Sequence, residues 1–248
     1  MPPRTPDPKY LEPLLGIVFD LDGTLVLSHH DFNRMRKTVI RIAEQHGVTP
    51  GHLSVDDPIH RTVEKAREEL HNSGVAEGQV FRFEAEYRKA IDAIEMEALP
   101  RTVPRPGSGP LLKALSERGF RIGLLTRSSE NFARGALVAT QLAPYFSYLR
   151  TRSTPGPAKP SPEALLALLR EMEVPRDRAV FVGDHLLDAE CAIAAHVRFY
   201  AVLPDPSESG NSAQSEARFL AAGSAAVARD LTVLAGQLDV TPARAVAP

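Results

Sequence analysis

Short apolar runs that stop abruptly at polar or turn-forming residues constrain the fold of this chain more than any other feature. The first is Leu14–Phe19, an unbroken apolar stretch that ends at Asp20. A run without polar alternation is typical of a strand that is buried on both faces. The same pattern recurs three times later in the chain, at residues 121–125, 179–182 and 198–203. The sequence therefore predicts four buried strands.

Helical patterns separate these predicted strands. Leucines at helical spacing precede Gly119, and a second leucine-rich segment follows Ser161 and Pro162, which favour the first turn of a helix. Residues 225–228 are a candidate for a last edge strand. Because strands that alternate with helices build parallel sheets covered on both faces, we expect an α/β fold.

Residues 28–103 interrupt this alternation. They contain no convincing strand and instead predict three polar-rich helices, near 31–46, 56–72 and 78–98. We expect an all-helical domain inserted after the first strand, able to hinge over the end of that strand. The remaining chain divides into a catalytic core at 14–27 and 104–238 and flexible termini at 1–13 and 239–248.

Polar side chains that can do chemistry follow the predicted strands where each strand ends. In an open parallel sheet, ligands bind beyond the carboxyl ends of the strands. Lys159, from a loop that precedes a helix, is expected to join the same edge. The expected cluster consists of Asp20, Asp22, Thr126, Lys159, Asp184 and Asp188. Four carboxylates, one hydroxyl and one ammonium are thereby predicted to converge.

Carboxylates gathered this closely need cations. At an effective dielectric constant of about 20, two carboxylates ~4 Å apart repel by roughly 4 kcal/mol. Lys159 supplies one positive charge, and a divalent ion bound by oxygen would supply the rest. With one cysteine in the chain and no spaced histidine pair, Mg²⁺ suits these ligands better than zinc. A phosphate ester is a substrate whose charge such a site can share.

The overall charge argues against two classes of partner. The 29 basic and 31 acidic residues give a formal net charge of −2, so neither a nucleic acid polymer nor an anionic membrane is expected. A small phosphorylated metabolite fits better. No run of about 18 apolar residues is present, and Cys191 is the only cysteine, which predicts a soluble, cytoplasmic protein. Monomer and dimer both stay open.

Four short motifs occur in order along the chain. They are Asp20-Leu21-Asp22-Gly23-Thr24-Leu25, Leu124-Leu125-Thr126, Lys159-Pro160-Ser161-Pro162-Glu163, and Gly183-Asp184 with Asp188. Together they resemble the motifs of the haloacid dehalogenase-like superfamily. The inserted helices resemble the helical (C1-type) cap of phosphoglycolate phosphatase-like hydrolases. The resemblance covers roughly residues 14–203 and implies a Rossmann-like core, a helical cap and a Mg²⁺-dependent phosphatase activity.

The resemblance also implies a role for each motif residue. Asp20 attacks phosphorus and becomes an aspartyl phosphate, while Asp22 protonates the leaving oxygen and then deprotonates water. Gly23 permits the tight turn that lets both carboxylates face one centre. Thr126 and Lys159 bind the transferring phosphoryl group. The expected phosphate-binding set is Asp20, Gly23, Thr126, Arg127 and Lys159.

The metal ligands follow from the same resemblance. Mg²⁺ is expected to bind the Asp20 carboxylate, the Asp22 backbone carbonyl and Asp184. Asp188 is either a ligand through a water molecule or the partner of Lys159.

Two residues depart from the family pattern. Arg127 follows the motif threonine where a small or amide residue is more usual, and it either reaches the substrate or pairs with the cap. His196 stands where relatives commonly carry glycine, and we expect it to alter only the turn before the next strand. Other polar residues near the hinge and on the first cap helix are interpreted as solvated, namely His29, His30, Arg34, Arg36 and Lys37.

Three other functions compete with a phosphatase. A phosphosugar mutase of the same superfamily would return the phosphoryl group to a sugar, and the sequence does not exclude it. A dehalogenase has no leaving alkoxide to protonate, so Asp22 argues against that activity. A binding protein that retains the fold without catalysis is disfavoured, because a suitable residue stands at every motif position.

Overall fold

The structure is a computed structural model that describes residues 13–204 and 212–238. The expected flexible termini, residues 1–13 and 239–248, lie outside the described residues except for Pro13. The chain forms two compact units. One unit is His29–Arg101, and the other consists of the described residues up to Ser28 and from Thr102 onward. We call them the helical unit and the core unit.

A six-stranded sheet forms the centre of the core unit, in the order β5-β4-β1-β6-β7-β8. Every neighbouring pair is parallel, which confirms the α/β fold. The strands are β1 (Gly16–Phe19), β4 (Arg121–Leu125), β5 (Tyr148–Arg150), β6 (Ala179–Gly183), β7 (Arg198–Val202) and β8 (Ala226–Ala228). All four predicted strands and the candidate edge strand are present. The short strand β5 was not predicted.

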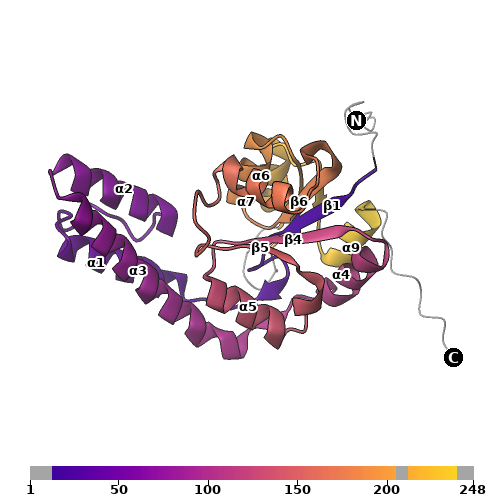
Figure 1. Cartoon of the computed structure of the whole chain (residues 1–248), viewed down its shortest axis with the longest axis horizontal. Coiled ribbons are helices and arrows are strands. Elements are labelled where there is room, and N and C mark those ends of the chain that lie inside the picture. The colour runs from indigo at the N-terminus through magenta and orange to yellow at the C-terminus, as the bar shows by residue number, and fades with distance from the viewer. Residues whose placement is uncertain (1–12, 205–211, 239–248) are drawn as a thin grey trace. The chain divides into compact units, whose positions relative to one another are not determined.

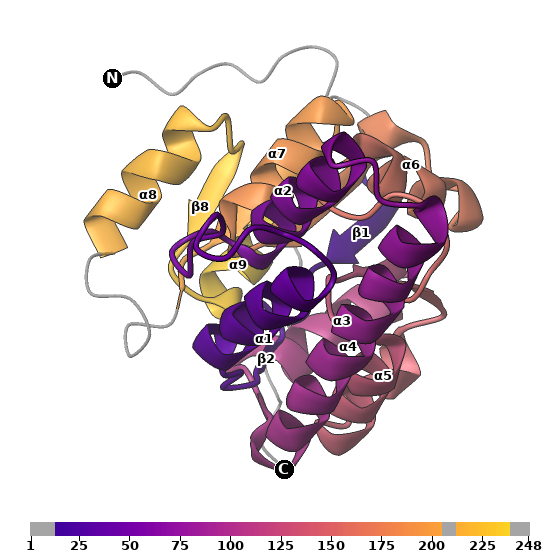
Figure 2. The ribbon, with the colours of Figure 1, turned by 90° about the vertical axis from the view of Figure 1, so that its left-hand side faces the viewer.

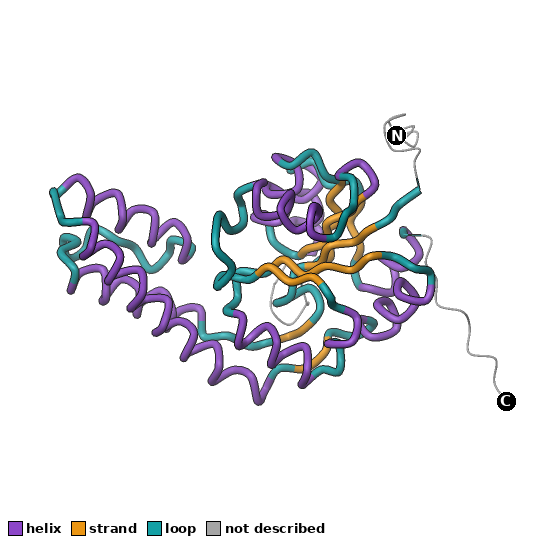
Figure 3. Tube along the Cα trace, in the orientation of Figure 1, coloured by secondary structure: helices purple, strands orange, loops and turns teal. Residues whose placement is uncertain are grey.

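Helices cover both faces of this sheet, as Figures 1 and 3 show. One face carries α6 (Pro162–Glu171) and α7 (Leu186–Ala194), and the other carries α4 (Ser108–Glu117), α5 (Glu130–Ala139) and α9 (Leu231–Gln237). Helix α8 (Ser212–Ala221) lies beside the edge strand β8 (Figure 2). No helix among the described residues is long and apolar enough to cross a membrane.

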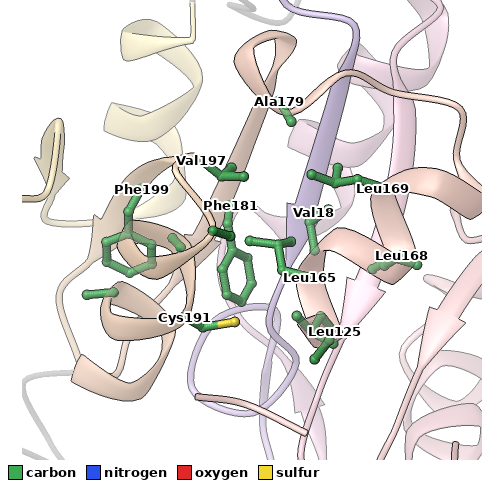
Figure 4. Packing of buried hydrophobic residues seen from close by; sticks show 14 of the residues in the cluster. Val18, Leu125, Leu165, Leu168, Leu169, Ala179, Phe181, Cys191, Val197 and Phe199 are labelled. Atoms are coloured by element: carbon green, nitrogen blue, oxygen red, sulfur yellow. The ribbon is translucent and has the colours of Figure 1, made fainter. Parts of the chain in front are cut away.

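The core packs the sheet against α6 and α7 (Figure 4). Val18, Leu165 and Phe181 are fully buried there, and burial of each such side chain stabilises the fold by about 1.5–3 kcal/mol. Cys191 belongs to this cluster, and burial raises the pKa of its thiol to about 12. The packing fixes β1 and β6 side by side, so their carboxyl ends reach the same edge.

The helical unit has a hydrophobic core of its own. Its helices are α1 (Phe32–Gln45), α2 (Ile59–Asn72) and α3 (Glu77–Ala98), followed by the short 3-10 helix Leu99–Arg101. Their apolar faces meet in a cluster that includes Met35, Val39, Ile42, Leu70, Phe83 and Ile91. The three predicted helices are confirmed, with ends that differ from the predicted ones by at most three residues.

A small two-stranded sheet stands where the chain leaves and re-enters the core unit. It pairs β2 (Val26–Leu27) with β3 (Val103–Pro104) in antiparallel register. The expectation that residues 28–103 lack a strand is therefore wrong at Val103, which pairs with Leu27. Two-residue strands leave no periodic signal in a sequence.

Candidate active site

The turn after β1 places two carboxylates at the carboxyl edge of the sheet. The Asp20 N–H donates to the carbonyl of Val182 on β6 at 2.9 Å, so the hydrogen bonding between β1 and β6 continues one residue beyond the end of β1. Gly23 has a left-handed backbone (φ 81°), and its N–H donates to the Val26 carbonyl at 2.8 Å. A Cβ at Gly23 would clash with Asp184 Oδ2. Glycine is therefore required both by the turn and by the close approach of Asp184.

Lys159 reaches this edge from the loop before α6. Its side chain is 3% exposed, and its Nζ lies 2.5 Å from Asp20 Oδ1 and 2.7 Å from Asp188 Oδ1. The amine is thus held between two carboxylates that are far apart in the sequence. Of the two roles expected for Asp188, the contact with Lys159 is the one seen directly.

Asp184 and Asp188 follow β6 on the same edge. Asp184 Oδ1 accepts a hydrogen bond from Thr24 Oγ1 at 2.8 Å. Asp188 lies in the first turn of α7, and its Oδ2 accepts from the His185 N–H at 3.2 Å in a capping box. His185, rather than Asp184, is the N-cap of α7, which leaves the Asp184 carboxylate directed at the turn after β1.

Three of these carboxylates can share one metal ion. Asp20, Asp184 and Asp188 each offer an oxygen, and these oxygens lie within 4.8 Å of one another. Carboxylate oxygens are the ligands that Mg²⁺ prefers. The carboxylate of Asp22 is not part of this group, and a contribution from its backbone carbonyl stays a prediction.

The cluster carries more negative than positive charge. Burial raises the pKa of Asp20 well above its ordinary value, against the opposing charge of Lys159. Burial, together with the nearby Asp188 carboxylate, raises the pKa of Asp184 to about 7. Burial alone would lower the pKa of Lys159, but Asp188 and Asp20 outweigh it, so that pKa is raised. The amine stays charged, and the carboxylates still favour a further cation.

The loop after β4 supplies the hydroxyl groups. Thr126 is buried, and its N–H donates to the Arg150 carbonyl on β5 at 3.0 Å. Ser128 donates its hydroxyl to Asp22 Oδ2 at 2.5 Å, and its N–H donates to Thr126 Oγ1 at 3.1 Å. Ser128 was not singled out in the sequence, where a serine two residues after the motif threonine is too common to stand out.

Two arginines support the backbone of this edge. The Arg127 guanidinium donates to the Lys159 carbonyl. The sequence predicted that Arg127 reaches the substrate or pairs with the cap, and this contact is neither of the two. Arg105, which the sequence analysis also missed, is buried and donates to the carbonyls of Gly23 and Leu203. Both side chains act on loops that carry the predicted site residues.

Three histidines named in the sequence analysis stand in turns or beside an aromatic ring. His196 lies in the turn between α7 and β7 and has a left-handed backbone (φ 55°). This conformation favours glycine, the residue that relatives were expected to carry at this position. His29 also has a positive φ of 52°, at the first residue of the helical unit. The His30 ring packs edge-on against Phe32, with 5.7 Å between ring centroids.

Comparisons with known proteins point to one family. A family model described as haloacid dehalogenase-like hydrolase matches residues 14–196. Phosphoglycolate phosphatase of Pseudomonas fluorescens is 31% identical over 189 residues, which span 75% of this chain and 68% of that protein.

Solved structures share the fold. A hydrolase from Pseudomonas syringae aligns with a TM-score of 0.63 at 22% identity, over 91% of this chain and 98% of that one. A HAD-superfamily hydrolase from Geobacter sulfurreducens aligns with a TM-score of 0.53 at 26% identity, over 91% of this chain and 96% of that one.

Proposed function

The chain belongs to the haloacid dehalogenase-like hydrolase family and is a hydrolase of the phosphatase type, and from that premise we propose that it hydrolyses a small phosphate monoester through an aspartyl phosphate on Asp20. One observation carries the proposal. The Lys159 amine lies between Asp20 and Asp188, beside Asp184, so one cluster brings together a candidate nucleophile, a cation that can bind an anion, and oxygen ligands for a metal.

The first half-reaction moves the phosphoryl group to the protein. A carboxylate oxygen of Asp20 forms a bond to phosphorus while the bond between phosphorus and the ester oxygen breaks. The leaving oxygen takes a proton from Asp22 and departs as an alcohol. Lys159 and the Thr126 hydroxyl are suited to bind the phosphoryl oxygens, because both are buried at the same edge.

The second half-reaction restores the enzyme. Asp22, now ionised, takes a proton from a water molecule whose oxygen attacks phosphorus. The bond between phosphorus and Asp20 breaks, which releases inorganic phosphate. Asp20 ends as a carboxylate and Asp22 ends protonated, so both groups are ready for the next ester.

Mg²⁺ is the cofactor that we propose for this site. The residues that would hold it are Asp20 and Asp184 through their carboxylates and Asp22 through its carbonyl, with Asp188 joining through water or serving only Lys159. The fit rests on the shared oxygen donors and on the environment of Asp184, where burial and the nearby Asp188 carboxylate raise its pKa and a bound cation would offset both effects. When bound, the ion would neutralise charge that develops on the phosphoryl group.

The substrate that we propose is a small phosphorylated metabolite, and phosphoglycolate is the first candidate because of the named relative. A cytoplasmic setting is part of the proposal, since a chain with Cys191 as its single cysteine needs no oxidising compartment. The helical unit is proposed as the cap that selects among substrates.

A panel of phosphate esters assayed with Mg²⁺ tests this function. The panel should contain phosphoglycolate, sugar phosphates and nucleotides, with inorganic phosphate and sugar isomers both measured. Release of phosphate at every turnover supports the hydrolase. Isomerisation without release would indicate a mutase instead, and activity that survives exhaustive chelation would contradict the metal.

A further inference from the structure

Ser128 is held rigidly beside the proposed acid–base residue. It is 5% exposed and follows β4 by three residues. Its N–H donates to Thr126 Oγ1 at 3.1 Å, and its carbonyl accepts from the Arg152 N–H at 3.0 Å. Both polar groups of its backbone are therefore engaged, and the direction of its side chain is set by the loop.

The Ser128 hydroxyl donates to Asp22 Oδ2 at 2.5 Å. A hydrogen bond to a carboxylate is shorter and stronger than one between neutral groups. Asp22 sits in the turn after β1, and Ser128 follows the neighbouring strand β4, so the contact ties two adjacent strand ends together. A carboxylate held at one oxygen cannot rotate freely about its last bond.

We propose that Ser128 is a positioning residue that orients the Asp22 carboxyl group for proton transfer to the leaving oxygen. This role rests on the proposed function, because it has meaning only if Asp22 is the acid. Proton transfer requires the donor within hydrogen-bond reach of the departing atom, so a rotated carboxyl loses rate even though the acid is still present.

The adjacent Ser129 uses its hydroxyl as a helix cap in the same loop. It is 1% exposed, and its hydroxyl accepts from the Phe132 N–H at 3.3 Å as the N-cap of α5. Ser128 and Ser129 thus differ in what their hydroxyls contact, while both are buried. Ser129→Ala is a matched control for Ser128→Ala.

The test compares two leaving groups. Kinetics are measured with 4-nitrophenyl phosphate, whose leaving group needs little protonation, and with the best alkyl phosphate of the ester panel. Since general acid catalysis contributes about 10²- to 10⁴-fold, misorientation of the acid in Ser128→Ala should lower kcat/KM for the alkyl ester by about tenfold or more. The value of kcat/KM for the aryl ester should be nearly unaffected, because kcat/KM reports only the first half-reaction, whereas the hydrolysis of the aspartyl phosphate is common to both esters.

The other variants separate positioning from folding. Ser128→Thr keeps the hydroxyl and should restore the rate for the alkyl ester. Ser129→Ala should lower thermal stability and leave the ratio between the two esters unchanged. In an Asp22→Asn background, Ser128→Ala should cause no further loss, because the group that it positions is gone.

Several results would overturn the role of Ser128. They are an equal loss of kcat/KM on both esters, an unchanged kcat/KM for the alkyl ester, and a full additional loss in the Asp22→Asn background. If Ser128→Ala does not fold, failure of folded Ser128→Thr to retain the wild-type ratio serves instead. Wild-type protein that hydrolyses no ester would refute the proposed function and this role together, whereas an active wild type with an insensitive Ser128→Ala refutes the role alone.

Discussion

The helical unit and the core unit use charged side chains in opposite ways. In the helical unit, Arg34 and Glu97 form an ion pair at 2.5 Å with side chains 51% and 55% exposed. In the core unit, the pair between Lys159 and Asp20 has side chains only 3% and 10% exposed. Exposed pairs contribute about 0–1 kcal/mol, whereas removal of one partner from a buried pair costs about 3–5 kcal/mol.

The contrast between the units indicates that the buried carboxylates of the core unit do not serve to stabilise the fold. Burial of carboxylates is unfavourable, and it raises the pKa values of Asp20 and Asp184. Strongly perturbed carboxyls gathered at a strand end are typical of catalytic sites. Exposed pairs of the helical unit, by contrast, could be lost with little consequence for the fold.

The largest expected effect comes from Asp20→Asn. An amide cannot act as the nucleophile, so kcat should fall by at least about 10⁴-fold. Because Lys159 keeps Asp188 as its partner and burial disfavours the Asp20 charge, the thermal unfolding midpoint should stay near that of wild type or rise, unlike in a pair that loses its sole partner. Asp57→Asn, which removes a partner of Lys65 on the helical unit, is the matched control and should leave kcat unchanged. Turnover by purified Asp20→Asn protein at a wild-type rate would break the comparison.

Lys159→Met should produce the next largest effect. It leaves the Asp20 and Asp188 carboxylates without their shared cation, so we expect at least about a 100-fold loss of kcat/KM and a loss of unfolding free energy of about 3–5 kcal/mol at neutral pH. Lys65→Met removes an exposed partner of Asp57 and serves as the control. Urea denaturation of both variants in chelator measures the difference, and equal stability losses would contradict the contrast between the units.

Asp184→Asn should weaken Mg²⁺ binding but stabilise the metal-free protein. The pKa of Asp184 is raised to about 7 from an ordinary 3.8, so the folded state retains a proton that the unfolded state releases. The destabilisation by this residue is absent at low pH, grows as pH rises through 4 to 7, and is complete above pH 7.

Denaturation of metal-free protein at two pH values checks this sign. The gain in unfolding free energy from Asp184→Asn should be on the order of 2–4 kcal/mol at pH 8 and clearly smaller at pH 5. Saturating Mg²⁺ should remove or reverse the advantage, because only wild type binds the ion well. A variant less stable than wild type at pH 8 without metal would contradict the account.

The smallest effect is expected for Arg34→Gln on the helical unit. Arg34 lines a surface hollow of about 390 Å³ together with Lys37 and Arg41, yet its guanidinium already pairs with Glu97. We expect unchanged stability and less than about a threefold change in kcat/KM across the ester panel. A tenfold rise in KM for anionic esters alone would show that this exposed charge takes part in substrate binding and would revise the comparison.

The sequence predicted the parts of the site that follow from strand order. Asp20 and Asp184 end β1 and β6, and two buried parallel strands bring their carboxyl ends to one edge whatever the loops do. Lys159 was predictable from its motif and from the need for a cation among carboxylates. The contacts of these residues agree with that reasoning, while their catalytic roles stay predictions.

What the sequence could not predict depends on details of packing. Strand β5 is three residues long and half-buried, so it lacks the apolar run that marks the other strands. The contacts of Ser128 with Asp22 and of Arg105 with Gly23 join residues 106 and 82 positions apart. Such contacts depend on how far each loop extends beyond the end of its strand. Neither hydrophobic periodicity nor motif spacing encodes that extension.

Identification of the residue that carries the phosphoryl group tests the central claim most directly. The enzyme is mixed with an ester of the panel that it hydrolyses, and the reaction is quenched in acid within the first turnover. Borohydride then reduces any aspartyl phosphate, and mass spectrometry maps the reduced residue. The account predicts reduction of a single aspartate, Asp20, in wild type and of none in Asp20→Asn. A phosphoryl group found on Asp22 or on a histidine, or rapid turnover with no covalent adduct at any time point, would contradict it.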